Sequence, residues 1–385
     1  MLSAELTLTS TNRIHRIAVG SIFFLYGLCF ASWASRIPTI QQHLGISDTR
    51  LGLILFTLPT GLFVSLPLSG WLTAKLGSRK IVIVASVAYA MALVSLGLAQ
   101  SSFQLIIGLF LFGLSGNMLN ISVNTQAVGV ESLYGRPIMA SFHGLWSLAG
   151  FSGASIGTYM MGTSILPYQH FVLIFLLAIT ILLVSQRYIL KQDVHSGKGQ
   201  PLFAMPDRSL VLLGAIAFCS MICEGTMFDW SGVYFKKVVL ADEAWMGAGL
   251  TAFMSTMALG RFVADWLTHK IGSKKILQLS GLLTASGLII SVIFPNLVTV
   301  IIGFLFVGFG VSSVVPLVYS AAGRSKVMSP GVALAAVSTI GFLGFLSGPP
   351  LIGLIAGATS LRISFSVIAL LGLCIAVLSK KVKFD

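Results

Sequence analysis

The stretch GWLTAKLGSRK, residues 70–80, returns almost unchanged as DWLTHKIGSKK at residues 265–275, and this return decides the fold. The displacement is 195 positions in a chain of 385 residues. The same displacement relates IIGLFLFG at residues 106–113 to IIGFLFVG at residues 301–308. A repeat displaced by half of the chain indicates that two copies of one structural unit follow each other.

The composition is that of a membrane protein. Hydrophobic residues make up 56% of the chain and charged residues 9%, with a mean hydropathy of +0.95, whereas soluble domains carry about 25% charged residues. Because a helix needs about 20 apolar residues to cross a bilayer, we predict twelve spans, at 15–37, 50–73, 79–99, 102–128, 137–163, 168–187, 209–235, 244–268, 274–294, 297–321, 330–356 and 361–379. In these runs apolar and polar residues do not alternate, as they do in the strands of a membrane β-barrel. The fold class is therefore all-helical and integral to the membrane.

The repeat and the spans together give the domain organisation. Residues 1–185 form one six-helix half, residues 209–385 form the second, and the polar segment 186–208 is a cytoplasmic linker. The two halves run parallel and are pseudo-symmetric, an arrangement in which a solute site lies between the halves near the midplane. The first apolar stretch is too long for a signal-peptide core, so we expect it to remain as the first span.

Positive charge sets the orientation. With twelve spans, one side of the membrane holds both termini, the linker and 18 of the 24 Lys and Arg residues, and the side richer in Lys and Arg is the cytoplasmic one. The net charge of +13 is thus explained by topology, and no basic face indicates a nucleic-acid partner. The four cysteines form no CxxC pair, so we expect neither a disulfide nor a metal site.

Several motifs resemble a known family. Gly70, Lys75, Gly77, Arg79 and Lys80 resemble the loop signature of the major facilitator superfamily, and a second copy follows at 270–275. SWASRIP (32–38), NTQAVGVE (124–131), GRPIMASFHGLWS (135–147) and DWSGVY (229–234) are similar to a branch of bacterial permeases related to fucose permeases and rhizopine uptake. The resemblance implies an alternating-access transporter of the bacterial inner membrane, without a cofactor, not an enzyme, and expected to be a monomer.

The repeated loops are predicted to gate transport. Their basic side chains sit at helix ends, where they can pair with acids or helix C-termini in one state only. The acid that the family carries before the basic residue is replaced by Ala74 and His269, and Asp265 is the substitute in the second half. The alternative is that these charges only set topology. The predicted gating residues are Lys75, Gly77, Arg79, Lys80, Arg261, Asp265, Lys270, Gly272 and Lys274.

Ionisable residues inside a span are candidates for proton coupling, because each costs about 2.5–3.5 kcal/mol at the helix centre. Glu224 lies about 22 Å along its span, with no Lys or Arg within two turns of the same span. Asp229 and His143 are the other two candidates. A neutral acid bonding between helices, an interfacial Asp and a packing His are the alternatives.

Amides and aromatic rings are candidates for the solute site. Amides bond hydroxyl-rich solutes without requiring charge, and aromatic rings stack on sugar-like faces. Inter-helix packing and interfacial anchoring are the alternatives. The predicted solute-binding residues are Asn117, Asn120, Asn124, Gln126, His143, Trp146, Trp33, Arg36 and Trp230.

The sequence thus favours proton symport of a small sugar-like or polyol-like solute. Drug or metabolite efflux by proton antiport is the alternative within transport, although the fifth span lacks a Gly-Pro pair and the fourth an early Arg. A membrane sensor without transport is the alternative of another class. No HExxH or P-loop motif supports an enzyme.

Overall fold

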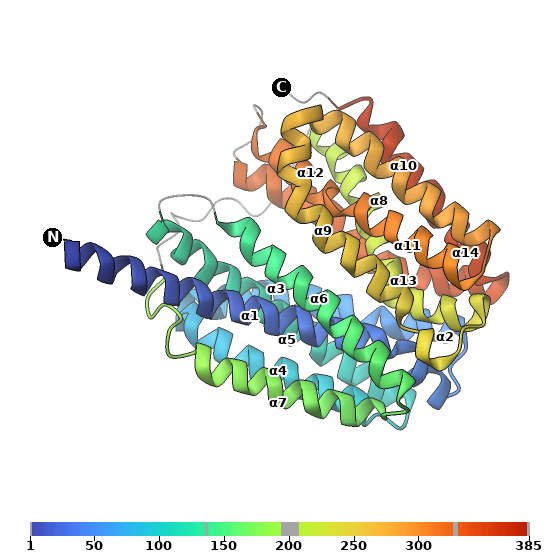
Figure 1. The fold of residues 1–385 in the computed structure, drawn as a ribbon, viewed down its shortest axis with the longest axis horizontal. Coiled ribbons are helices and arrows are strands. Elements are labelled where there is room, and N and C mark those ends of the chain that lie inside the picture. The colour runs from blue at the N-terminus through green and yellow to red at the C-terminus, as the bar shows by residue number, and fades with distance from the viewer. Residues whose placement is uncertain (1, 135–137, 194–207, 326–329, 383–385) are drawn as a thin grey trace. The chain divides into compact units, whose positions relative to one another are not determined.

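The structure, a computed structural model, describes residues 2–134, 138–193, 208–325 and 330–382 (Figure 1). Within these ranges all regular elements are helices. They are α1 (Leu2–His43), α2 (Asp48–Leu55), α3 (Thr57–Leu76), α4 (Ser78–Gly97), α5 (Ser102–Tyr134), α6 (Met139–Gly162), α7 (Pro167–Ser185), α8 (Arg208–Tyr234), η1 (Phe235–Val239), η2 (Glu243–Trp245), α9 (Ala248–Ile271), α10 (Ser273–Ile293), α11 (Leu297–Ser312), α12 (Val314–Gly323), α13 (Pro330–Ala358) and α14 (Leu361–Ser379).

The all-helical prediction is confirmed, and each predicted span coincides with a helix or with two helices in sequence. Ten helical stretches within the described residues are long and apolar enough to cross a membrane. The remaining two predicted spans correspond to α6 and α9, each of 24 residues. In hydrocarbon a helix satisfies its own backbone hydrogen bonds, which is why apolar stretches of this length become helices.

Two predicted spans are interrupted by a proline. The span predicted at 50–73 breaks at Phe56, and the span predicted at 297–321 breaks at Ser313. In each case a proline, Pro59 or Pro316, follows the last residue of the first helix by four positions. A proline ring clashes with the carbonyl four residues earlier and offers it no N–H, so the preceding helix ends there.

The repeat in the sequence is also a repeat in local geometry. Gly77 and Gly272 precede α4 and α10 with φ of 85° and 84°, a region that favours glycine. The Lys75 ammonium lies 4.7 Å from the centre of the Trp71 ring, and that of Lys270 lies 5.1 Å from the centre of the Trp266 ring. The two copies therefore build the same turn and the same cation–π contact.

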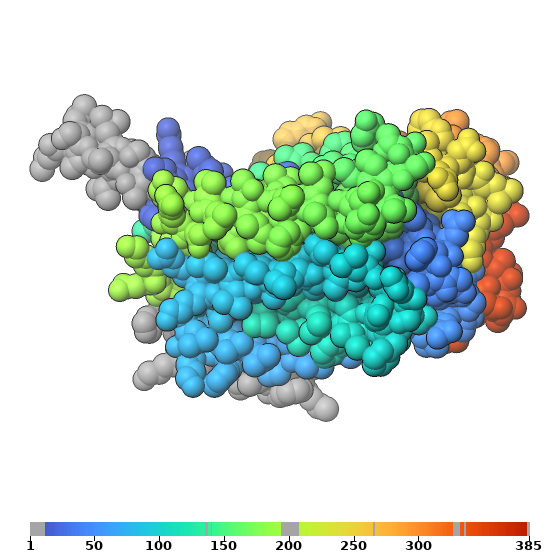
Figure 2. Space-filling model, turned by 90° about the horizontal axis from the view of Figure 1, so that it is seen from below, coloured from blue at the N-terminus to red at the C-terminus, as the bar shows by residue number. Residues whose placement is uncertain are grey.

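The chain packs as two compact units. The first contains residues 1–40 and 57–196, and the second contains residues 41–56 and 197–385. In the first unit α7 lies along α4, as Figures 1 and 2 show. Residues 41–56 precede the linker in sequence but pack with the second unit.

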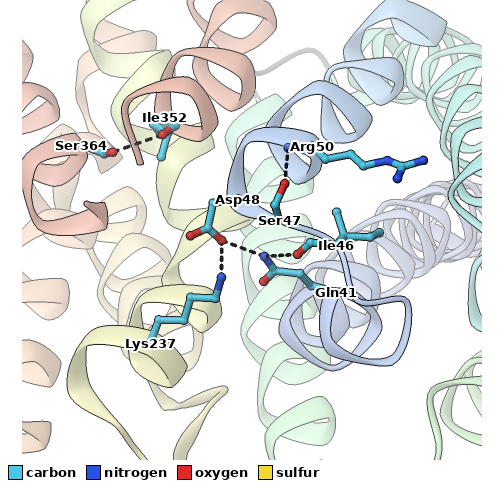
Figure 3. Close-up of polar contacts among 8 residues, drawn as sticks. All are labelled: Gln41, Ile46, Ser47, Asp48, Arg50, Lys237, Ile352 and Ser364. Carbon is cyan, nitrogen blue, oxygen red and sulfur yellow. Dashed lines mark hydrogen bonds and ion pairs between the residues drawn. The ribbon is translucent and has the colours of Figure 1, made fainter. Parts of the chain in front are cut away.

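Helix α2 packs tightly on α13 within the second unit. A Cβ atom on Gly52 would lie 2.5 Å from the Pro349 carbonyl oxygen and 2.9 Å from the Gly353 Cα. Next to this contact, Asp48 accepts a bond from Lys237 of η1 at 2.5 Å and one from Gln41 at 2.8 Å (Figure 3). We call the contact of α2 with α13 the α2–α13 seam. Because backbone atoms form it, the seam has no room for a side chain.

We therefore expect Gly52→Ala to destabilise the protein by about 1–3 kcal/mol, the usual cost of overpacking. Thermal unfolding of the purified protein in detergent measures the effect. Gly323→Ala is the matched control in the same unit, because its added Cβ would find its nearest neighbouring atom at 4.0 Å. Equal stability of the two variants would contradict tight packing at the seam.

Candidate functional site

A half-buried ion pair joins α8 to α9. The Arg261 guanidinium lies 3.6 Å from the Glu224 carboxylate, and the two side chains are 20% and 13% exposed. The sequence has no Lys or Arg within two turns of Glu224 in the same span, and the cation beside it comes from the next helix. Since a buried charge without a partner is costly, each side chain compensates the other. Arg261, predicted as a gating residue, thus contacts the predicted coupling acid.

Asp229 follows on the same helix and is half-buried. It makes no hydrogen bond or ion pair with any residue that the structure describes. Trp230, the next residue, is completely buried. Asp265 belongs to α9, but its side chain lies outside the described part of the chain. The second unit therefore holds two half-buried acids on α8, of which Glu224 is paired.

The amides of α5 separate into two groups. The Asn117 amide is buried and donates to the Ser65 hydroxyl at 2.7 Å and to the Leu62 carbonyl at 3.3 Å, so it joins α5 to α3. Asn124 donates to the side-chain oxygen of Asn120 at 2.9 Å, one turn away, and both side chains are half-buried. In the described part of the chain, the hydrogen bonds of Asn120 and Asn124 stay within α5 and do not join it to another helix.

Gln126 has a different role. Its amide accepts from the Leu190 N–H at 2.7 Å and donates to the Leu190 carbonyl at 3.0 Å. It also donates to the Ser78 hydroxyl at 2.6 Å, and the Ser78 N–H donates to the Asp193 carboxylate at 2.7 Å. Gln126 therefore fixes the segment after α7, and Asp193 binds the start of α4, where a helix N-terminus favours an anion.

Aromatic rings gather around His143 in the first unit. The His143 side chain is exposed, and its ring centre lies 5.5 Å from that of Phe23. Trp146, one turn later, lies 6.2 Å from Tyr26 and 6.1 Å from Phe30, measured between ring centres. Tyr26, Phe30 and Trp146 are half-buried. This group presents ring faces and an imidazole.

Trp33 and Arg36, the other predicted solute-binding residues of the first unit, are completely buried. The Arg36 Nε–H donates to Nδ1 of His170 on α7 at 3.1 Å. Sequence reasoning missed His170, because a single His 134 residues away carries no pattern that points to Arg36. Their contact depends on how α1 and α7 pack.

Most of the predicted gating residues lie at helix ends, whereas Arg261 and Asp265 lie within α9. Arg79 donates to the Gln186 carbonyl at 2.9 Å, at the C-terminal end of α7, the type of partner that the sequence predicts for it. Lys80, Lys270, Gly272 and Lys274 are exposed. Within the described residues no three His, Cys, Asp or Glu side chains gather as metal ligands would.

Comparison with known proteins agrees with this helical architecture. The chain matches the sequence profile of the Major Facilitator Superfamily over residues 19–249 and 238–383. The chain belongs to the Major Facilitator Superfamily. It is therefore a multi-pass membrane protein and a secondary transporter rather than an enzyme, and the resemblance of its loop motifs to this superfamily is confirmed.

Relatives and solved structures cover nearly the whole chain. An uncharacterized MFS-type transporter of Yersinia pestis is 34% identical over 360 residues, 94% of each chain. Membrane protein MosC of Rhizobium meliloti is 28% identical over 363 residues, 93% of this chain and 88% of MosC. The nucleoside transporter NupG superposes with a TM-score of 0.74 at 10% identity, over 94% of this chain and 99% of NupG. That structural likeness shows the fold.

The ion pair predicts energetic coupling between Glu224 and Arg261. Arg261→Met leaves the Glu224 carboxylate without its partner, and Glu224→Gln leaves the Arg261 guanidinium without its partner. Each single variant should therefore lose more stability than the double variant. We expect a coupling energy of about 1–3 kcal/mol in a double-mutant cycle of thermal stability. Additive single changes would show that the pair contributes nothing.

Proposed function

We propose that this transporter carries a small polar, sugar-like or polyol-like solute by proton symport, with Glu224 as the coupling acid. The Glu224–Arg261 ion pair in the membrane interior is the observation that supports the proposal. Low polarity disfavours an isolated charge. A proton on Glu224 therefore changes the charge balance of α8 and α9 more than it would at a surface.

The pair couples protonation to helix packing in the following way. With Glu224 ionised, its attraction for Arg261 holds α8 and α9 together. When Glu224 takes a proton, the guanidinium loses its counter-charge and needs another partner or water. Protonation thus favours a different arrangement of the two helices. Such a change in relative stability is what lets a proton gradient drive a conformational cycle.

The solute side of the proposal rests on the first unit. The Asn120–Asn124 pair offers amide donors and acceptors, and the rings of Tyr26, Phe30 and Trp146 offer faces for stacking. His143 is the exposed polar group beside them. None of these groups carries a fixed negative charge, and they match a solute rich in hydroxyl groups.

In the proposed alternating-access cycle, the α2–α13 seam opens. The proposed location is the bacterial cytoplasmic membrane, with both termini cytoplasmic, because the loops on that side carry most of the Lys and Arg residues. The seam then lies at the outer face. The ion pair of Asp48 with Lys237 beside the seam is partly exposed, with side chains 17% and 39% accessible. It therefore stabilises the closed seam by about 1 kcal/mol or less.

The experiment measures transport by Glu224→Gln in proteoliposomes, first with a panel of sugars and polyols to find the solute. Gln keeps the shape and hydrogen bonds of Glu but cannot titrate. We expect uphill accumulation driven by a proton gradient to be lost and downhill exchange of the same solute to be kept. Glu243→Gln, a change at an exposed acid of η2, is the matched control.

Proton-driven accumulation by Glu224→Gln would rule out Glu224 as the coupling acid. Asp229→Asn should then show the expected loss, because Asp229 is the second half-buried acid of α8. No transport of any sugar or polyol by the unmodified protein would instead refute the proposed solute class.

A further inference from the structure

Four lysines lie where α10 begins and α14 ends. Lys274 and Lys275 are the second and third residues of α10, and Lys380 and Lys381 directly follow the last residue of α14. All four side chains are exposed, and no hydrogen bond or ion pair joins their ammonium groups to any residue that the structure describes. We call these four residues the α10–α14 lysine cluster.

The packing of α10 on α14 brings the two lysine pairs to one level. A Cβ on Gly281 of α10 would lie 2.5 Å from the Ala376 nitrogen of α14, and a Cβ on Gly372 would lie 3.1 Å from the Ala285 nitrogen. Because the contact moves forward on α10 as it moves back on α14, the two helices are antiparallel. The lysines lie about 6–11 Å along the helices beyond the first of these contacts. All four charges are therefore at the same end of this helix pair.

The lysines continue an exposed apolar face. Leu279 and Leu282 are exposed one and two turns after Lys275 on α10. On α14, Val377 is exposed one turn before Lys381. Residues at this spacing share one face of a helix. Since α10 and α14 are each long and apolar enough to cross a membrane, this face contacts acyl chains, and the lysines extend to the level of the headgroups.

The start of α10 adds to the positive charge. No side chain caps the first N–H groups of α10, and a helix N-terminus carries a partial positive charge. Lys274 and Lys275 lie in this first turn, where the helix dipole disfavours a cation. An anion bound here would therefore interact favourably with both the lysines and the helix.

The first unit shows which kind of group binds at the equivalent position. Ser78 of α4, the counterpart of Ser273 in the sequence repeat, donates its N–H to the Asp193 carboxylate at 2.7 Å. In that unit the chain itself supplies an anionic oxygen at the start of the helix. In the second unit no carboxylate of the described residues lies within 4.0 Å of an ammonium group of the lysine cluster.

We infer that the α10–α14 lysine cluster binds the phosphate of an anionic phospholipid in the membrane leaflet at this end of the helices. The acyl chains lie along the exposed apolar face of α10 and α14, and the phosphate oxygens accept from the ammonium groups. A soluble anion would match the lysines but not the apolar face that continues from them. Lipid binding goes beyond the proposed solute and proton coupling, and it is measured without transport.

Titration of the purified full-length protein in detergent tests this site. Native mass spectrometry gives the apparent affinity for phosphatidylglycerol, for phosphatidylcholine and for soluble glycerol phosphate. We expect the unmodified protein to bind phosphatidylglycerol more tightly than the other two. Lys274→Gln with Lys275→Gln, and Lys380→Gln with Lys381→Gln, should each weaken binding of phosphatidylglycerol about tenfold, because one basic residue at an anionic membrane surface contributes about fivefold.

Arg187→Gln with Lys191→Gln is the matched control, because both residues are exposed and follow α7 in the first unit. It should keep the affinity of the unmodified protein. Phosphatidylglycerol with a photoactivatable headgroup gives a readout that relies on no variant, and it should cross-link the unmodified protein at residues 273–276 or 379–382.

The inference would be overturned by equal affinity for phosphatidylglycerol and phosphatidylcholine, or by glycerol phosphate binding as tightly as the lipid. An unchanged affinity for phosphatidylglycerol in both lysine variants, or an equal loss in the control, would show that these charges serve topology alone. Cross-links confined to other parts of the chain would contradict the site directly.

Discussion

A charged side chain inside the hydrocarbon must find compensation within the protein, and this constraint shapes both units. In the second unit Glu224 and Arg261 compensate each other across α8 and α9. In the first unit Arg36 has a neutral His170 in place of an acid. The first arrangement is the basis of the proposed proton coupling, because protonation removes one of two balanced charges.

The seam between α2 and α13 obeys a different constraint, which is close packing of backbones. Gly52 and Gly353 bring the two helices together without side chains between them, as small residues do in membrane helix pairs. Pro59 ends α2 at Leu55, so this short helix is not continuous with α3. A separate short segment packed through glycines can leave its partner without unfolding a long helix.

The spans and the repeat were predictable from the sequence, because hydropathy and a fixed displacement are properties of the chain alone. Contacts between helices were not. The partner of Glu224 depends on which faces of α8 and α9 meet, and Asn117 and Gln126 look like solute ligands in sequence but bond to Ser65 and Leu190 in the structure. The helix breaks at Phe56 and Ser313 are each followed by a proline, Pro59 or Pro316, that signals them in the sequence. The continuous apolar stretches around these prolines predicted unbroken spans instead.

In the proposed transport cycle α2 leaves α13, and a cross-link across the seam is the most direct measurement of this. A Cβ at Gly357 would lie 3.1 Å from that of Thr49, near the roughly 3.5–4.5 Å found in disulfides. Thr49→Cys with Gly357→Cys, in a variant without native cysteines, should lose solute exchange on oxidation and regain it on reduction. Full exchange by the cross-linked protein would contradict a transport cycle in which the α2–α13 seam opens.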